Sequence, residues 1–247
     1  MAESLIALGV SHAFTTRGGG KSAPPFDSLN LGRGVDDAPA AVIANRQRVA
    51  SALGRSPGDH VEASQVHGRE IALVTAAHRG HQIDGVDGMI SRDPGALLAV
   101  HSADCVPLLL VDPARAAIAA VHTGWRGTAA GAGIAAVEAM VETFGSRPAD
   151  LVAAIGPAIG PCCYEVDAPV VERFSQWSWR DRVFTPGRPG RWMLDLWEAN
   201  RLQLVGAGIP PAAITIAPLC TVHHPALFFS HRRDGRSGRM GAMIALS

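Results

Sequence analysis

The strongest constraint on the fold is one apolar segment, residues 96–127, which reads ALLAVHSADCVPLLLVDPARAAIAAVHTGWRG. Turn signals at Ala103–Asp104 and Asp112–Pro113 divide it into three short apolar runs. Runs of this length bounded by turn residues are typical of buried strands. We therefore predict three strands at about 96–101, 106–111 and 116–122.

The rest of the chain alternates between helical and strand-like patterns. Helical periodicity predicts helices at 39–53, at about 128–144, where Gly145 and Pro148 follow, and at about 167–177 and 195–206. Further strands are expected in ALGVSHAFTTR, HVEASQVHG, EIALVT, GMIS, LVAAIG, ITIAP, LFFSHR and GAMIAL. No linker or internal repeat interrupts the pattern, so we predict a single α+β domain with mixed sheets over residues 1–247.

Composition argues against several classes of function. Lys and Arg together number 22, as do Asp and Glu, so no charge excess favours nucleic acid or an anionic membrane. The N-terminus lacks the pattern of a signal peptide, and no run of 18 apolar residues occurs. The four cysteines are few and two are adjacent, which does not suit a disulfide framework. We expect a reduced, cytoplasmic protein.

Three residues of metal-ligand type stand at expected strand ends: His67 in QVHG, Cys105 in SADC and His122 in VHTG. A catalytic zinc site uses three such ligands and keeps one position for water. The separations, from 67 to 105 and from 105 to 122, match no short zinc-finger pattern, so these ligands have to converge through the fold. Two other interpretations remain open here. The three residues are ordinary core or turn residues, or Cys105 is a nucleophile with His122 as its base.

The segment HTGWRGT favours an anion. We expect Gly124 and Gly127 to permit a turn after His122, and a helix near Thr128 to aim its N–H groups, with Arg126, at phosphate. The run FFSHRRDG is typical of a cleft rim, and we interpret Cys162 and Cys163 as packing residues rather than ligands.

Taken together, several motifs in this order resemble one family: HAFTTRGG, SLNLG, QVHG, ADCVPLLLVD, VHTGWRGT, IGPAIGPCCYEV and FFSHRRDG with GRMGA. The chain is similar to the YfiH/laccase-domain family, also called the peptidoglycan editing factor or FAMIN-like purine nucleoside enzyme family, from about residue 10 to 244. The resemblance implies an α/β/β/α sandwich of mixed sheets. It also implies that His67, Cys105 and His122 bind one metal, zinc before copper. Ser102 stands where the family usually has Thr, and the adjacent His101 is expected on the opposite face of its strand.

The resemblance further implies phosphate-dependent cleavage of purine nucleosides and deamination of adenosine, with nucleoside and phosphate as partners. Expected substrate contacts are Arg126, Arg17, Asn30, Arg46, Arg232 and Arg233. We expect a monomer or weak homodimer. The alternatives are a Cys–His hydrolase or amidase acting on peptidoglycan precursors, a non-catalytic binding module, and a copper phenol oxidase.

Overall fold

Two mixed β-sheets form the centre of the protein, which a computed structural model describes for residues 2–246. The first sheet has the strand order β1 (Ser11–Phe14), β14 (Met240–Ala245), β6 (Leu97–Ser102), β2 (His60–Ser64) and β4 (Gln82–Asp84). The second has the order β13 (Ile214–Ile216), β9 (Val152–Ile155), β7 (Val106–Asp112), β8 (Ala117–Thr123), β5 (Gly88–Ser91) and β3 (Ile71–Val74). Both sheets contain parallel and antiparallel pairs, as predicted.

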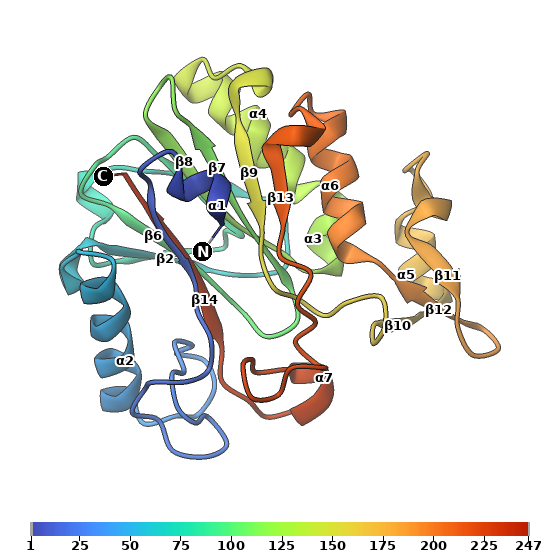
Figure 1. Ribbon diagram of the computed structural model, residues 1–247, viewed down its shortest axis with the longest axis horizontal. Helices are drawn as coiled ribbons and strands as arrows, with labels where there is room; N and C mark the ends of the chain where they lie inside the picture. The colour runs from blue at the N-terminus through green and yellow to red at the C-terminus, as the bar shows by residue number, and fades with distance from the viewer. Residues whose placement is uncertain (1, 247) are drawn as a thin grey trace.

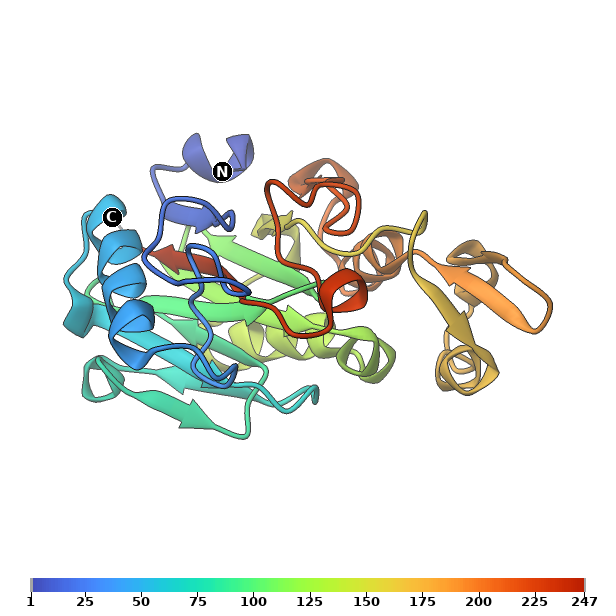
Figure 2. The same ribbon diagram turned by 90° about the horizontal axis from the view of Figure 1, so that it is seen from below.

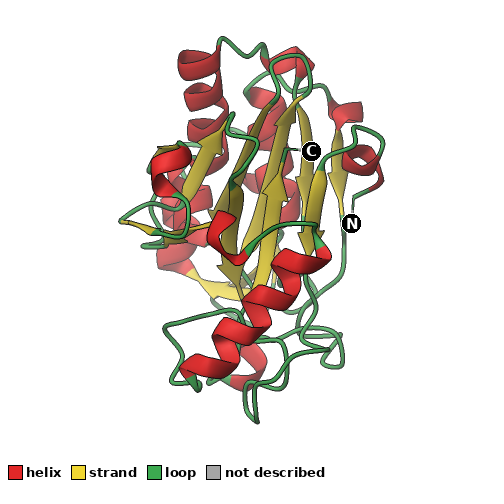
Figure 3. Cartoon of the chain, turned by 90° about the vertical axis from the view of Figure 1, so that its left-hand side faces the viewer, coloured by secondary structure: helices red, strands yellow, loops and turns green. Residues whose placement is uncertain are grey.

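Helices cover the two outer faces of this pair of sheets. Helix α2 (Pro39–Ala52) packs through Val49 and Ala50 on the outer face of the first sheet. Helices α4 (Ala132–Phe144) and α6 (Leu196–Gly206) pack on the outer face of the second. Figures 1 and 2 show α2 on one side of the sheets and α4 and α6 on the other, and Figure 3 looks onto α2 with the strands behind it. The predicted α/β/β/α sandwich is confirmed.

The apolar segment behaves as predicted, since the bounds of β6, β7 and β8 each lie within one residue of the expected ones. Every residue of β7 and β8 is buried, because β7 and β8 are central strands with an apolar layer on each face. Leu109 faces the layer between the sheets, whereas Leu108 and Leu110 face the helices. The strands pair antiparallel with Pro107 opposite His122, so the start of β7 lies beside the end of β8.

Four expectations need correction. The helix predicted at 128–144 is two helices, α3 (Trp125–Ala130) and α4, because Gly131 between them is left-handed with φ 81°. The helix predicted at 167–177 is shorter, α5 (Ala168–Arg173). The LFFSHR segment is no strand: Phe228 and Phe229 are buried in a loop, and α7 (His231–Asp234) follows. The helix that follows His122 begins at Trp125 and not near Thr128, because Gly124 is its extended N-cap residue.

Several short elements carry too few residues for a periodic signal. A small sheet of β10 (Glu165–Asp167), β12 (Arg191–Leu194) and β11 (Phe184–Pro186) projects from the sandwich in Figure 2. Helix α1 (Glu3–Ile6) precedes β1. Single 3₁₀ turns occupy Pro57–Asp59, Ala76–His78, Pro148–Asp150, Arg180–Arg182 and Pro211–Ala213. Within residues 2–246, no helix has the length and apolar character needed to cross a membrane.

Candidate metal centre

His67, Cys105 and His122 come together although they are far apart in the sequence. The antiparallel register places Cys105, just before β7, beside His122 near the end of β8, and His67 reaches them from the loop between β2 and β3. The sulfur atom and one ring nitrogen from each histidine all lie within 4.8 Å of one another. The two imidazole rings meet edge to face with centroids 5.0 Å apart. The predicted convergence is confirmed.

A buried carboxylate, Asp87, organises the two histidines. Its side chain lies 2.8 Å from Nδ1 of His122 and accepts hydrogen bonds from the backbone amides of Val66, His67 and Gly68 at 2.6–3.1 Å. His67 has a left-handed backbone, with φ 62°, which these bonds hold. Burial alone would raise the pKa of Asp87, but the hydrogen bonds from His122 and the amides leave this pKa lowered. Because Nδ1 of His122 is engaged, its Nε2 is the nitrogen available to a ligand.

Cys105 is oriented by its neighbour Asp104, which also has a left-handed backbone with φ 93°. The Asp104 carboxylate accepts hydrogen bonds from the Thr221 hydroxyl at 2.5 Å and from the Arg232 amide at 2.6 Å. Its carbonyl accepts a hydrogen bond from the Ile159 amide at 2.9 Å. Three segments distant in sequence therefore hold the turn that presents the Cys105 thiol.

The glycines of HTGWRGT serve a different purpose from the predicted turn. Gly124 has an ordinary φ of −69°, but a Cβ atom added to it would lie 2.9 Å from the Cys105 sulfur. Gly127 lies inside α3, and a Cβ atom there would lie 2.9 Å from the carbonyl oxygen of Gly68. Contacts this close exclude a side chain, so these glycines bring α3 against Cys105 and against the loop that carries His67.

The charge state of the thiol follows from these neighbours. Burial would raise the pKa of Cys105, but His122 and His67 lower it below its usual value. In turn, Cys105 and Asp87 raise the pKa of His122 against the effect of burial. The arrangement favours a thiolate at Cys105, which is the form that binds metal or attacks as a nucleophile.

A cavity of about 530 Å³ opens beside the three residues and extends to a buried polar cluster under α2. In that cluster Glu62 contacts Arg46, His60 and Arg33. Burial would raise the pKa of Glu62, but His60, His101 and Arg46 lower it to about 2. The same burial, with Arg46 nearby, lowers the pKa of His101 to about 3, so this ring is neutral near pH 7.

His101 lies on the α2-facing side of β6, the side that also carries Leu97 and Ala99. It lines the same cavity as His67, Cys105 and His122, whereas the sequence predicted that it would face away from them. Among residues 2–246, its buried Nε2 has no hydrogen-bond partner. Gln65 holds the His101 backbone by two hydrogen bonds of 2.7 Å. A bound molecule in the cavity would satisfy the unpaired nitrogen.

Of the six expected substrate contacts, only Arg46 lines the cavity, where it bonds to Glu62 and to the carbonyl of Leu31. Arg126 lies outside the cavity lining and is exposed, with its guanidinium 4.3 Å above the Trp125 ring.

The other four also lie outside the cavity lining and bond to the protein's own groups: Arg17 to Asp27, Asn30 to Gly32 and Asp37, Arg232 to Glu165, and Arg233 to Thr221 and Phe228. Their roles toward substrate stay predictions.

Sequence reasoning missed Asp87, Glu62, Gln65 and Arg239, of which the last three line the cavity. The one signal for Asp87 is an acidic residue directly before a buried strand, in GVDGMIS. Glu62 stands within HVEAS, where a charged residue in an apolar run indicates a buried partner. Their partners lie in other segments, so no local pattern identifies them.

Comparison with known proteins places the chain in a family. The family model described as Multi-copper polyphenol oxidoreductase laccase matches residues 11–247. Purine nucleoside phosphorylase YlmD of Geobacillus stearothermophilus is 43% identical over 251 residues, covering 96% of this chain and 90% of that protein. Purine nucleoside phosphorylase of Deinococcus radiodurans is 43% identical over 240 residues, covering 97% and 90%.

Solved structures agree with these relatives. The crystal structure of Bacillus licheniformis hypothetical protein YfiH has a TM-score of 0.95 and 41% identity, covering 97% of this chain and 93% of that chain. The structure of YlmD from Geobacillus stearothermophilus has a TM-score of 0.93 and 41% identity, covering 99% and 94%. The motifs, the sandwich and these matches agree, and the chain belongs to the YfiH/laccase-domain family.

Proposed function

We propose that this protein is a metal-dependent purine nucleoside phosphorylase, with residues 1–247 as one catalytic domain. The observation that carries the proposal is the set of three ligand atoms within 4.8 Å of one another, beside a polar cavity of about 530 Å³. Cavities that hold a small organic ligand usually measure about 300–1,000 Å³, which suits a nucleoside. The names of the relatives support the substrate class.

The side chains of the centre fit a metal ion. Two imidazoles and one thiolate suit zinc, with copper as the second choice, and three protein ligands leave a position for water or substrate. The contact of Asp87 with Nδ1 of His122 matches the carboxylate–histidine arrangement that orients metal ligands. When bound, such an ion supplies a Lewis acid and lowers the pKa of a bound water.

For phosphorolysis, the residues around the centre bind and orient the two reactants. The unpaired Nε2 of His101 contacts the nucleoside, and the cavity walls at Gln65 and Glu62 surround it. Arg126 holds phosphate, because α3 begins against Cys105 and the guanidinium of Arg126 is exposed. A phosphate oxygen then bonds to C1′ of the sugar as the bond from C1′ to the purine nitrogen breaks, and the purine takes the proton that the phosphate gives up.

Adenosine deamination is the second proposed reaction of this site. It uses water in place of phosphate: the water oxygen bonds to C6 of the purine ring, the bond from C6 to the amino nitrogen breaks, and the amino group leaves as ammonia. Both reactions bind the nucleoside in the same cavity, but only phosphorolysis needs Arg126.

A second candidate function is a Cys–His hydrolase or amidase acting on peptidoglycan precursors. Asp87, His122 and Cys105 form a chain of an acid, a base and a thiol, with 2.8 Å between the acid and the imidazole. This is the order of groups in cysteine hydrolases that need no metal. A copper phenol oxidase has less support, because one copper at this centre does not provide the four-electron chemistry of oxygen reduction.

One experiment separates these functions. Inosine, guanosine, adenosine and a muropeptide are incubated with the protein, with and without phosphate, and zinc per chain is measured on the same sample. The proposal predicts release of purine base that needs both phosphate and metal. Hydrolysis of the muropeptide amide that persists in metal-free protein, without any turnover of nucleoside, would support the hydrolase instead. A protein that turns over none of these compounds would be a binding module.

A further inference from the structure

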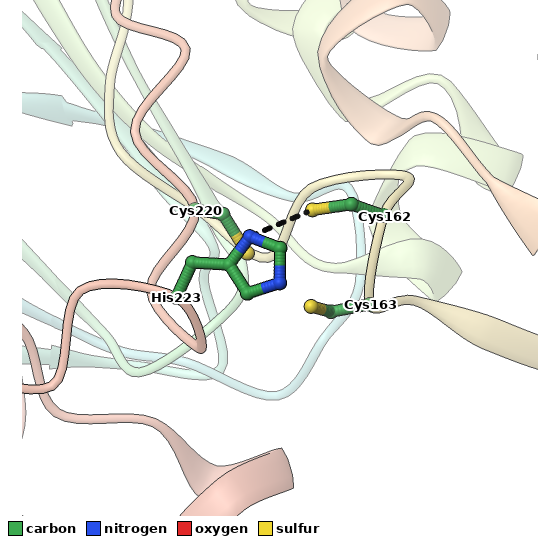
Figure 4. A group of neighbouring side chains, drawn as sticks. All are labelled: Cys162, Cys163, Cys220 and His223. Carbon is green, nitrogen blue, oxygen red and sulfur yellow. Dashed lines mark hydrogen bonds between the residues drawn. The ribbon is translucent and has the colours of Figure 1, made fainter.

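A second group of metal-ligand side chains lies away from the cavity. Cys162, Cys163, Cys220 and His223 offer ligand atoms that all lie within 4.8 Å of one another. Figure 4 shows the three sulfur atoms arranged around one imidazole ring. Cys162 and His223 are exposed and their side chains approach to 3.6 Å, so the expectation that Cys162 is a packing residue is wrong. Cys163 does pack partly against the apolar core under the helices.

The group is built on two turns that face each other. One turn closes through hydrogen bonds of 3.0 Å from the amides of Cys163 and Tyr164 to the carbonyl of Gly160. The other carries Cys220 and His223 with two residues between them, so that both side chains come from a single turn. An isolated β-bridge between Ala158 and Cys220 joins the two turns. The four side chains are therefore held by connected backbone, not by loose loops.

A backbone amide points at the buried sulfur of this group. The Gly160 amide, in the first turn, donates to the Cys220 sulfur, in the second turn, at 3.3 Å. A hydrogen bond of this kind stabilises a thiolate, as it does around metal-bound sulfur. It also links the two turns at the sulfur atom.

Two arginines of the FFSHRRDG motif brace the turns. Arg232 donates to the carbonyl of Glu165 at 3.0 Å, just after the first turn. Arg233 donates to the carbonyl of Thr221 at 2.7 Å, inside the second turn, and pairs with the carboxylate of Asp234. Three thiolates and a divalent cation leave one net negative charge, which the guanidinium of Arg232 offsets.

We propose that Cys162, Cys163, Cys220 and His223 form a second metal site that binds zinc. Four protein ligands close the coordination sphere, which is the mark of a structural zinc site. A zinc–sulfur distance of about 2.3 Å places sulfur atoms roughly 3.8 Å apart in a tetrahedron. Side-chain movements of about 1 Å are enough to reach this separation from the observed separations of up to 4.8 Å.

The turn that carries Cys220 and His223 also contacts the segment that holds Cys105. Thr221 lies in the same turn as Cys220 and His223, and its hydroxyl donates to the carboxylate of Asp104. Asp104 directly precedes Cys105, so a metal that fixes this turn also fixes the support of Cys105. The proposed site is therefore structural, and its loss lowers the stability of this region more than the activity of the centre at His67, Cys105 and His122.

The test uses the full chain purified with a thiol reductant, in a Cys105→Ala/His122→Ala background that removes the other centre. Zn²⁺ alone, and then Co²⁺ alone, is titrated into the chelator-treated protein. We expect one tight zinc equivalent and a cobalt charge-transfer band of three thiolates, stronger than any single cysteine produces. Adding His223→Ala raises the Kd for Zn²⁺ by at least about 10-fold, because a direct ligand is lost. His224→Ala, which removes the neighbouring imidazole, is the matched control and leaves the Kd unchanged.

Alkylation of the wild-type protein gives a second measurement that needs no variant. We expect exposed Cys162 to react with iodoacetamide after chelation and added Zn²⁺ to protect it, as measured by peptide mass spectrometry. Equal effects of His223→Ala and His224→Ala, or no protection of Cys162, would overturn the proposal. So would a disulfide among Cys162, Cys163 and Cys220 in the reduced preparation. Failure of nucleoside turnover leaves this test unaffected, because it does not use activity.

Discussion

The two groups of cysteine and histidine side chains differ in how they are built. His67, Cys105 and His122 come from strand ends and a loop, contain one sulfur atom and face a cavity of about 530 Å³. The four-residue group of Cys162, Cys163, Cys220 and His223 comes from two facing turns and contains three sulfur atoms. Three ligands leave room for a reacting molecule, whereas four do not. On the two proposals above, the first group would serve metal chemistry and the second would serve metal-dependent structure.

The supporting groups differ in the same way. Behind the three-residue centre lies a buried carboxylate, Asp87, in contact with a ligand imidazole. Beside the four-residue group lie Arg232 and Arg233, which bind backbone carbonyls and no ligand side chain. The first arrangement tunes a ligand, and the second fixes the shape of two turns.

The largest expected effect comes from removing the one sulfur of the three-residue centre. Cys105→Ala lowers kcat/KM for inosine phosphorolysis by about 10³-fold or more, which corresponds to roughly 4 kcal/mol or more. Cys162→Ser, the matched loss of a sulfur from the four-residue group, changes kcat/KM far less, because Cys162 does not line the cavity. Steady-state kinetics on both variants measures the difference. Equal losses would mean that the two groups do not have separate roles.

The second prediction concerns Glu62, whose buried carboxylate pairs with Arg46 in the wall of the cavity. Glu62→Gln leaves Arg46 buried without its ionic partner and lowers the free energy of unfolding by about 3 kcal/mol at pH 7. The exposed pair of Glu138 with Arg69 is the control, and Glu138→Gln changes the stability by less than about 1 kcal/mol. Urea denaturation measures both effects.

The pH dependence of the Glu62 effect has a definite sign. The pKa of Glu62 is lowered to about 2 from an ordinary value near 4.5, so its contribution is present above pH 4.5. It is lost as the pH falls from 4.5 toward 2, because the unfolded chain takes up a proton that the folded carboxylate does not take up until about pH 2. The stability difference between wild type and Glu62→Gln should shrink over this range. A constant difference would contradict the assignment.

The third prediction concerns phosphate. Arg126→Ala weakens phosphate-dependent cleavage by roughly 1.5–3 kcal/mol, as expected for the loss of a charge-assisted hydrogen bond. Zinc content stays the same because Arg126 is not a ligand, and adenosine deamination falls less because it uses water. The measurement is kcat/KM for both reactions, with metal content determined in parallel. Equal losses in both reactions would show that Arg126 holds the nucleoside or the fold.

The smallest effect is expected behind the ligand His122. Asp87→Asn weakens metal binding at the three-residue centre by about 10–100-fold, because the orientation of the imidazole is lost. Zinc at the four-residue group is unaffected. The zinc affinity is measured by competition with a chelator. The protein also carries His223→Ala, which weakens the four-residue group, so the measured affinity reports on the three-residue centre. An unchanged affinity would mean that Asp87 only holds the loop of His67.

The sequence predicted secondary structure correctly where a buried segment shows a local pattern of apolar residues bounded by turns. Residues 96–122 yielded three strands to within one residue, and the ends of those strands pointed to Cys105 and His122. It failed where contacts are long-range. Asp87 meets His122 across 35 residues. The four-residue group joins turns near 162 and 221 that share no pattern. The break between α3 and α4 depends on the conformation of a single glycine, Gly131.

The most direct test of the account removes metal stepwise from the wild-type protein. A chelator titration is followed by metal per chain, inosine phosphorolysis in phosphate buffer, and the melting temperature, all measured on the same samples. The account predicts two metals per chain. Activity is lost as metal leaves His67, Cys105 and His122. The melting temperature falls as metal leaves the four-residue group. Readdition of Zn²⁺ restores both. Full phosphorolysis by metal-free protein would contradict the account.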